Sequence, residues 1–291
     1  MSSVITVMNM KGGVGKTTLT MHIGGILGNY KIKDKPRKVL LIDYDPQHNL
    51  TQAFISAKHY YNAIEPLKKT CLAILQDDIS KLDPLQIQVP GKRTPPRVET
   101  LVQRISTSEG SVLDLVPSTL DLMYIALGRS EKKLDVIDER FRQFIEQCKE
   151  TYDVILIDCH PAGSILTKTS LENSDHVIIP VAPHPFAVRG IRLMKQFIEA
   201  CRASPDKALP HIVFNNVPRT GIASEESSIR ADPRFAKYCL QHTLKRYNVF
   251  SQPAEGSKFV WQTRQGRRPY SGEAFDRLMK VTEEVVERLS L

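Results

Sequence analysis

The residues from Asn9 to Thr18 have the types and spacing of a loop that binds phosphate. Glycines at three positions let consecutive backbone N–H groups turn toward an anion, and a helix that follows adds its positive end. The Lys16 ammonium can reach the β- and γ-phosphates of a nucleotide, and the Thr17 hydroxyl can bind Mg²⁺. We therefore predict a nucleotide site made of Lys11, Gly12, Gly13, Val14, Gly15, Lys16, Thr17 and Thr18.

The flanking segments support this interpretation. Val4–Met8 is an apolar run typical of a buried strand, and Leu19–Leu27 has the spacing of a helix. The alternative is a glycine-rich turn with a surface lysine. Such a turn would not need a buried strand before it and a helix after it. The loop departs from the usual pattern in two ways, because Met10 stands where a glycine is usual and a second lysine, Lys11, follows it.

Two carboxylates follow the next apolar strand, Val39–Asp43. Residues just beyond the carboxyl end of a parallel strand lie where open α/β sheets bind ligands. Asp45 can orient or deprotonate an attacking water, and Asp43 can hold a water on Mg²⁺. A turn stabilised by Asp45-Pro46 is the structural alternative.

The strongest buried strand, Tyr152–Asp158, also ends in a carboxylate. An acid in this position, in a chain that already has a phosphate loop, is typical of a Walker B strand, so Asp158 is expected to bind Mg²⁺ through water. His160 follows in the adjoining loop, and it can either face the γ-phosphate or serve a structural purpose.

The string Lys-Gly-Gly-Val-Gly-Lys-Thr-Thr resembles the deviant Walker A motif of the ParA/MinD family of ATPases, and Leu-Ile-Asp-Tyr-Asp-Pro-Gln-His-Asn resembles the motif that follows it. The resemblance runs from Val4 to the last helix and is thinnest between about residues 56 and 110. Relatives usually continue Cys-Pro-Pro after the Walker B acid, whereas this chain has Cys159-His160-Pro161.

The resemblance implies a weak, Mg²⁺-dependent ATPase that forms a homodimer around two ATP molecules. In that family the residue matching Lys11 reaches the phosphates of the partner subunit, and the residue matching Asp45 is tied to hydrolysis. The catalytic residues are then Lys11, Lys16 and Asp45, and the metal site comprises Thr17, Asp43 and Asp158. Asn215 is a candidate contact for the adenine base, with a turn asparagine as the equal alternative. A ParB-like centromere-binding partner would stimulate hydrolysis during partition of a plasmid or chromosome.

The charge of the chain favours an acidic partner. The net charge is +8 and the sequence pI is about 9.2, and Arg189–Tyr270 holds fifteen Lys/Arg against six Asp/Glu. Such an excess fits sequence-independent binding to double-stranded DNA, and no helix-turn-helix or zinc-finger pattern is present. A solvated basic surface is the alternative. The candidate DNA-binding residues are Arg192, Lys195, Arg219, Arg230, Lys245, Arg246, Arg267 and Arg268.

Two other classes of function compete with partition. A MinD-like membrane-positioning ATPase would need a basic amphipathic last helix, but residues 272–289 hold five acids on the polar face. A metabolic P-loop synthetase or kinase would need a small-molecule pocket. An iron–sulfur reductase is disfavoured because the five cysteines lack suitable spacing. With no leader pattern and no apolar run of about 18 residues, we expect a cytoplasmic, nucleoid-associated protein.

The whole chain, residues 1–291, is predicted to be one α/β P-loop domain. Its mainly parallel, twisted sheet should carry helices on both faces. Residues 49–79 have a helical pattern, and the proline-rich, basic segment around 80–110 is predicted to be an insertion or a hairpin.

Overall fold

The structure is a computed structural model that describes residues 2–77, 82–83, 90–127, 134–161, 163–251, 259, 261 and 270–291. Its described strands form one sheet in the order β3-β4-β2-β5-β1-β6-β7. They are β1 (Ser3–Val7), β2 (Lys38–Tyr44), β3 (Gln103–Ser108), β4 (Ser111–Val116), β5 (Val154–Cys159), β6 (His176–Val181) and β7 (Leu209–Phe214). Every pairing is parallel except β3 with β4. The predicted mainly parallel α/β sheet is confirmed.

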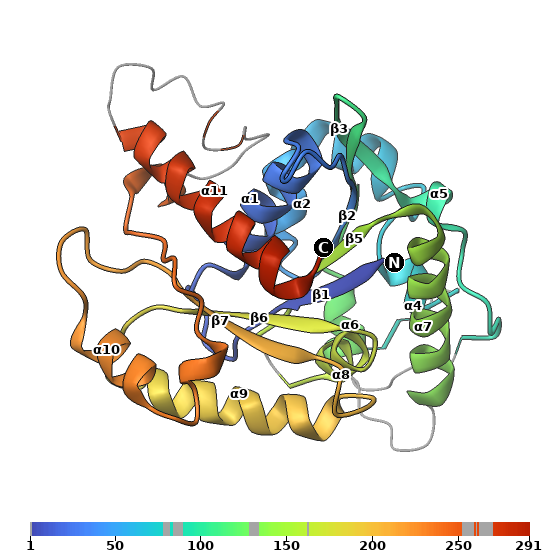
Figure 1. The fold of residues 1–291 in the computed structure, drawn as a ribbon. Helices are drawn as coiled ribbons and strands as arrows, with labels where there is room; N and C mark the ends of the chain where they lie inside the picture. Colours follow the sequence, from blue (N-terminus) through green and yellow to red (C-terminus); the bar gives the residue numbers. More distant parts are fainter. Residues whose placement is uncertain are drawn as a thin grey trace.

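Helices cover both faces of this sheet (Figure 1). One face carries α1 (Lys16–Asn29), α2 (Asn49–Phe54) and α11 (Tyr270–Leu289). The other carries α4 (Leu72–Leu75), α5 (Val98–Leu101), α6 (Leu122–Leu127), α7 (Leu134–Thr151) and α8 (Ile165–Glu172), with α9 (Ala187–Cys201) and α10 (Ser224–Ala231) beside β6 and β7. The shorter elements are α3 (Ala57–His59), the π-helix η1 (Tyr60–Ile64) and the 3₁₀ helices η2 (Ala236–Tyr238) and η3 (Asn248–Ser251).

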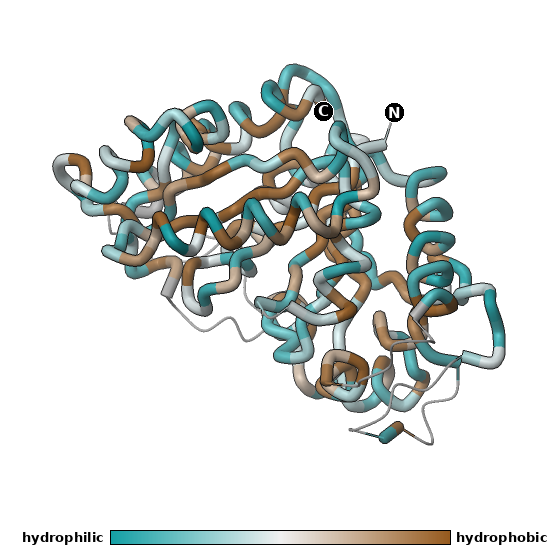
Figure 2. The backbone as a smooth tube through the Cα atoms, turned by 90° about the horizontal axis from the view of Figure 1, so that it is seen from below, coloured by the Kyte–Doolittle hydropathy of each residue, from teal (hydrophilic) through white to brown (hydrophobic). Residues whose placement is uncertain are grey.

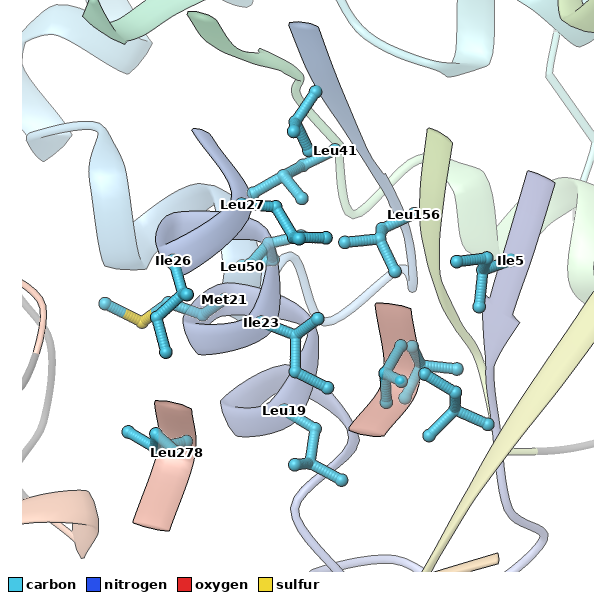
Figure 3. Packing of buried hydrophobic residues seen from close by; sticks show 14 of the residues in the cluster. Ile5, Leu19, Met21, Ile23, Ile26, Leu27, Leu41, Leu50, Leu156 and Leu278 are labelled. Carbon is cyan, nitrogen blue, oxygen red and sulfur yellow. The ribbon is translucent and has the colours of Figure 1, made fainter. Parts of the chain in front are cut away.

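Alternation along each strand explains why the sheet needs both layers. On β1, Ile5 and Val7 pack into the cluster with α1 and α11, whereas Val4 and Met8 pack into the clusters of the opposite face. Figure 3 shows Ile5 and Leu156 from the sheet facing Leu19 and Ile23 of α1. From below, hydrophobic residues gather along the strands and alternate with hydrophilic ones along the helices (Figure 2).

Glycines let α1 lie close against the sheet. A Cβ at Gly24 would come 2.5 Å from a methyl group of Leu41, and one at Gly28 would come 2.8 Å from the Leu113 Cβ. These separations are shorter than van der Waals contact, so a side chain at either position would push the helix away. The helix begins at Lys16 rather than at Leu19 as the sequence suggested, because Gly15 turns the chain in the left-handed region directly before it.

The segment from 49 to 79 is less regular than predicted. The described part is broken into α2, α3, η1 and α4. Ile55 adopts an extended conformation after α2, and the Ser56 side chain then accepts a hydrogen bond from the His59 N–H to start a new turn. An apolar pattern alone does not reveal such interruptions, so the helical pattern predicted for residues 49–79 is found in the described part as short helices separated by turns.

The proline-rich segment around 80–110 is described only in part, because residues 78–81 and 84–89 lie outside the described residues. Its later half contains α5 and then β3, which forms an antiparallel edge with β4. Any role of this segment in DNA or partner contact stays a prediction.

The last helix, α11, packs on the domain. Leu278, Val281 and Val285 are buried, and the Glu284 carboxylate accepts hydrogen bonds from the N–H groups of Gln241 and His242 at 2.7 and 2.9 Å. Its apolar face is therefore covered by the chain itself, as its acidic polar face suggested. None of the described helices is both long and apolar enough to cross a bilayer.

A buried histidine on α1 makes stability sensitive to pH. The His22 ring lies edge-on to Phe250 and Trp261, and its Nδ1 atom is 2.7 Å from the Thr18 carbonyl oxygen. Burial lowers the pKa of His22 to about 4, and the bond to Thr18 opposes only part of that shift. The folded protein thus keeps this ring neutral over a range in which an unfolded chain protonates it.

We expect His22 to destabilise the fold as the pH falls. Between about pH 7.5 and pH 5 the unfolded state takes up a proton at this position and the folded state does not, which removes about 2 kcal/mol from the free energy of unfolding. His22→Phe keeps a ring between Phe250 and Trp261 and should lose that part of the pH dependence. Urea unfolding at both pH values measures it, with the exposed His59→Gln as control; equal pH slopes in wild type and His22→Phe would contradict the assignment.

Candidate active site

The phosphate loop joins β1 to α1 at the carboxyl edge of the sheet. Gly13 and Gly15 have φ angles of 72° and 91°, in the left-handed region where side chains are disfavoured. The Asn9 side chain fastens the start of the loop: its amide donates to the Pro180 carbonyl of β6 at 2.8 Å, and its carbonyl accepts from the Lys11 N–H at 3.0 Å. These two bonds therefore fix the start of the loop against β6.

The two lysines of the loop lie in different surroundings. Lys16 is 8% exposed, and its ammonium donates to the Lys11 carbonyl at 3.5 Å. Lys11 itself is exposed. One cation thus lies within the site and the other is open to a second molecule.

Asp158 has the surroundings of a metal ligand. It is the last residue but one of β5, level with Val7 of β1 and with Asp43 of β2. It is 1% exposed, and burial raises its pKa to about 7, with a Thr17 hydroxyl bond lowering it and the Asp45 charge adding to the rise. Its Oδ2 atom is buried without a hydrogen-bond partner among the described residues. A carboxylate oxygen left open beside a threonine hydroxyl is the donor set that Mg²⁺ prefers, so the residues fit this ion.

Asp43, on the neighbouring strand, differs from Asp158 because both of its oxygens accept hydrogen bonds from the chain. Its Oδ2 atom accepts from the Thr51 N–H at 2.7 Å and from the Thr51 hydroxyl at 2.6 Å, and its Oδ1 atom accepts from the Asp45 N–H at 3.3 Å. Burial raises the pKa of Asp43 well above its usual value, and the nearby Asp158 charge adds to the effect. In the structure Asp43 fastens the segment from Asp45 to Thr51, and its place on a metal-bound water stays a prediction.

Asp45 directly follows β2, and its carboxylate has two hydrogen-bond partners. Its Oδ1 atom accepts from the Gln47 N–H at 3.0 Å and lies 3.1 Å from Nδ1 of His160. Burial alone would raise the pKa of Asp45, but these two bonds and the charges of His160 and Lys16 bring it below the usual value. An ionised carboxylate here suits the predicted handling of a water. The sequence left open whether His160 faces the γ-phosphate or serves a structural purpose. In the structure its described side-chain contact is with Asp45.

Ser118 is a site residue that sequence reasoning missed. Its hydroxyl donates to the Asp45 carbonyl at 2.8 Å, and its N–H donates to the Thr51 hydroxyl at 2.8 Å. The Tyr60 hydroxyl in turn donates to the Ser118 carbonyl at 2.9 Å. The signal was present, because Pro117-Ser118 directly follows the buried strand β4, as Asp45 follows β2.

Asn215 lies against the phosphate loop. It is 8% exposed, and its side-chain amide donates to the Val14 carbonyl at 2.8 Å. A Cβ at Gly15 would come 2.1 Å from that same nitrogen, so the loop and Asn215 fit only because residue 15 is glycine. In these contacts Asn215 supports the loop, and its contact with adenine stays a prediction.

The predicted DNA-binding residues divide into two groups. Arg192 on α9 is exposed, and so are Arg219 and Arg246, which meet where the Arg219 guanidinium donates to the Arg246 carbonyl at 3.1 Å. These three remain accessible to a polyanion.

Three other predicted DNA-binding residues are occupied within the fold. Arg230 donates to Glu226 at 2.8 Å and to the Leu240 carbonyl at 2.7 Å. Lys245 pairs with Glu273 at 3.4 Å, and Lys195 lies over the Tyr238 ring. Arg267 and Arg268 lie outside the described residues.

The chain is similar to known proteins in sequence and in fold. A family profile described as an AAA domain matches residues 2–210. The sporulation initiation inhibitor protein Soj of Bacillus subtilis is 30% identical over 193 residues, which are 66% of this chain and 62% of Soj.

Two solved structures have the same fold over nearly their whole length. One is a putative plasmid partition protein from Borrelia burgdorferi bound to AMPPNP, at 22% identity and a TM-score of 0.70, covering 99% of this chain and 100% of that one. The other is pNOB8 ParA bound to nonspecific DNA, at 22% identity and a TM-score of 0.63, covering 100% and 99%.

We expect Asn215→Ala to weaken the binding of ATP and of inorganic tripolyphosphate equally, by about 3- to 10-fold, because one hydrogen bond to the loop is lost. Tripolyphosphate has no base, so the comparison separates support of the loop from contact with adenine. Calorimetric titration of both ligands measures the effect. A loss confined to ATP would contradict loop support as the main role and favour the base contact.

Proposed function

Because the chain belongs to the AAA-domain family of ParA/Soj-type P-loop ATPases, we propose that it hydrolyses ATP as a nucleotide-bridged homodimer that binds DNA without sequence preference. A ParB-like centromere-binding partner stimulates that hydrolysis, and the cycle moves a plasmid or chromosome. The observation that carries the proposal is the contrast within the loop, where Lys16 is buried at the phosphate position and Lys11 is exposed.

The residues of the site have different roles in hydrolysis. Lys16 neutralises phosphate charge, and the buried Asp45 orients the attacking water. Thr17 and Asp158 would hold Mg²⁺, and Asp43 would hold a water on that ion. When bound, the ion neutralises charge that develops on the phosphate oxygens. The open Oδ2 atom of Asp158 supports this assignment.

The exposed Lys11 gives the site its dependence on a second subunit. Its N–H is fastened by Asn9, so the backbone of this residue stays with its own loop. Its side chain is exposed and is free to reach the phosphates held by a facing copy. A charge that is buried between two subunits and hydrogen-bonded to phosphate strengthens association.

Lys11→Ala should abolish dimer formation with AMPPNP while leaving nucleotide affinity of the monomer nearly unchanged. Loss of a buried charge contact weakens association by at least about 30-fold. Size-exclusion chromatography with light scattering measures dimerisation, and a fluorescent ATP analogue measures affinity. Lys35→Ala, an exposed lysine at the other edge of the sheet, is the matched control. A Lys11→Ala protein that dimerises like wild type would refute the cross-subunit role.

Nonspecific DNA binding is supported by the exposed arginines and by the similarity of the fold to pNOB8 ParA bound to nonspecific DNA. Contacts to phosphate carry no sequence information and weaken as salt rises. DNA retention of this kind would place the ATP-bound protein on the nucleoid in the cytoplasm.

The test is binding of random duplex DNA with ATP, with ADP and without nucleotide, each over a range of salt. We expect retention with ATP alone, and Arg192→Ala/Arg246→Ala should lower the slope of log affinity against log salt by about 1.8, the share of two phosphate contacts. Lys35→Ala/Lys38→Ala removes the same charge at the opposite edge of the sheet and should leave the slope unchanged.

Absence of DNA binding in every nucleotide state would overturn the partition proposal. Binding to vesicles of anionic lipid in its place would favour the membrane-positioning alternative.

A further inference from the structure

The histidine that replaces the usual proline after the Walker B strand contacts Asp45. His160 follows Cys159, the last residue of β5, and its Nδ1 atom lies 3.1 Å from Oδ1 of Asp45, which follows β2. The side chains are 15% and 12% exposed, so the contact is mostly screened from solvent. A proline at position 160 has no side-chain donor and could not make it.

The chemistry of the pair fixes which atom is the donor. An aspartate carboxylate is ionised at neutral pH, and an ionised carboxylate only accepts hydrogen bonds. The proton must therefore lie on Nδ1 of His160, and the bond is His160 donating to Asp45. The Gln47 N–H donates to the same oxygen at 3.0 Å.

Two donors on one oxygen determine how the carboxylate is turned. Gln47 and His160 approach Oδ1 from different loops. Among the described residues, Oδ2 of Asp45 takes part in no hydrogen bond. The backbone on either side is already held, by Ser118 at the Asp45 carbonyl and by Asp43 at the Asp45 N–H. The carboxylate itself can still rotate, and the hydrogen bond from His160, in the loop after β5, restricts that rotation.

We propose that His160 is a positioning residue for hydrolysis, which holds Oδ1 of Asp45 so that Oδ2 is directed at the attacking water. This proposal rests on the role proposed above for Asp45. Misplacement of a catalytic group by about 1 Å costs on the order of 100-fold in rate, so restricting one rotation has a measurable effect. The position after Cys159 thus sets the turnover of this chain, and ATP affinity does not depend on it.

Three substitutions at this position separate a hydrogen-bond role from a packing role. His160→Ala removes the donor, His160→Asn keeps an amide N–H at the place of Nδ1, and His160→Gln carries its amide one carbon further out. We expect kcat to fall about 10-fold or more in His160→Ala and His160→Gln and to stay within about threefold of wild type in His160→Asn. The KM for ATP should change by less than about twofold in all three, because the proposed role of His160 is to hold Asp45 and not to bind the nucleotide.

A double-mutant cycle with Asp45→Asn tests whether His160 acts through Asp45. The measurement is steady-state ATP hydrolysis by the full chain with Mg²⁺ and DNA, beside melting temperatures that show each variant folded. We expect Asp45→Asn/His160→Ala to be no slower than Asp45→Asn alone.

Rate losses that multiply in the double variant would overturn the positioning role, and so would full turnover in His160→Ala beside an inactive Asp45→Asn. Equal loss in His160→Asn and His160→Gln would overturn it too. Full turnover in Asp45→Asn would instead remove Asp45 from the proposed mechanism, and the positioning of Asp45 with it.

Discussion

Two buried carboxylates on neighbouring strands are the constraint around which the site is built. Asp43 and Asp158 are register partners at the ends of β2 and β5, and each is at most 1% exposed. Burial disfavours the charged form of each carboxylate, and the Asp158 charge raises the pKa of Asp43 further by like-charge repulsion. The two carboxylates differ in the hydrogen bonds that they receive. Asp43 receives three hydrogen bonds from the chain, whereas Asp158 keeps one oxygen without a partner among the described residues. That asymmetry distinguishes a structural acid from one open to a cation.

The loops at this edge depend on one another because each is fastened to the next. Asn9 ties the phosphate loop to β6, and Asn215 ties it to the end of β7. On the other side, Thr51 joins Asp43 to Ser118, which in turn holds the Asp45 carbonyl. Hydrogen bonds in a buried network reinforce one another, so these contacts hold the loops of the site in one arrangement relative to each other.

Much of the fold was predictable because parallel strands buried on both faces appear as continuous apolar runs. The runs ending at Met8, Asp43 and Asp158 mark three such strands, and the acids mark the carboxyl ends of two of them. Which strands are neighbours is not encoded locally, so the sequence did not show that Asp43 lies level with Asp158. For the same reason Ser118 was missed, since its role depends on β4 lying beside β2. The broken helix after Asn49 was missed because extended residues such as Ile55 interrupt the backbone without changing the apolar pattern.

Charge counts and charge placement carry different information, which matters most for the basic half of the chain. The excess of basic residues between Arg189 and Tyr270 is a property of composition, but a cation tied to a carboxylate contributes little to the field at a distance. Arg230 and Lys245 are tied in this way, to Glu226 and Glu273. Arg219 and Arg246 remain exposed in loops that follow β7, as Lys11 does after β1. Parallel strands direct both sets of loops to the same edge of the sheet. Exposed cations of the basic half and of the phosphate loop therefore lie at one edge of the sheet, which a count of charges does not show.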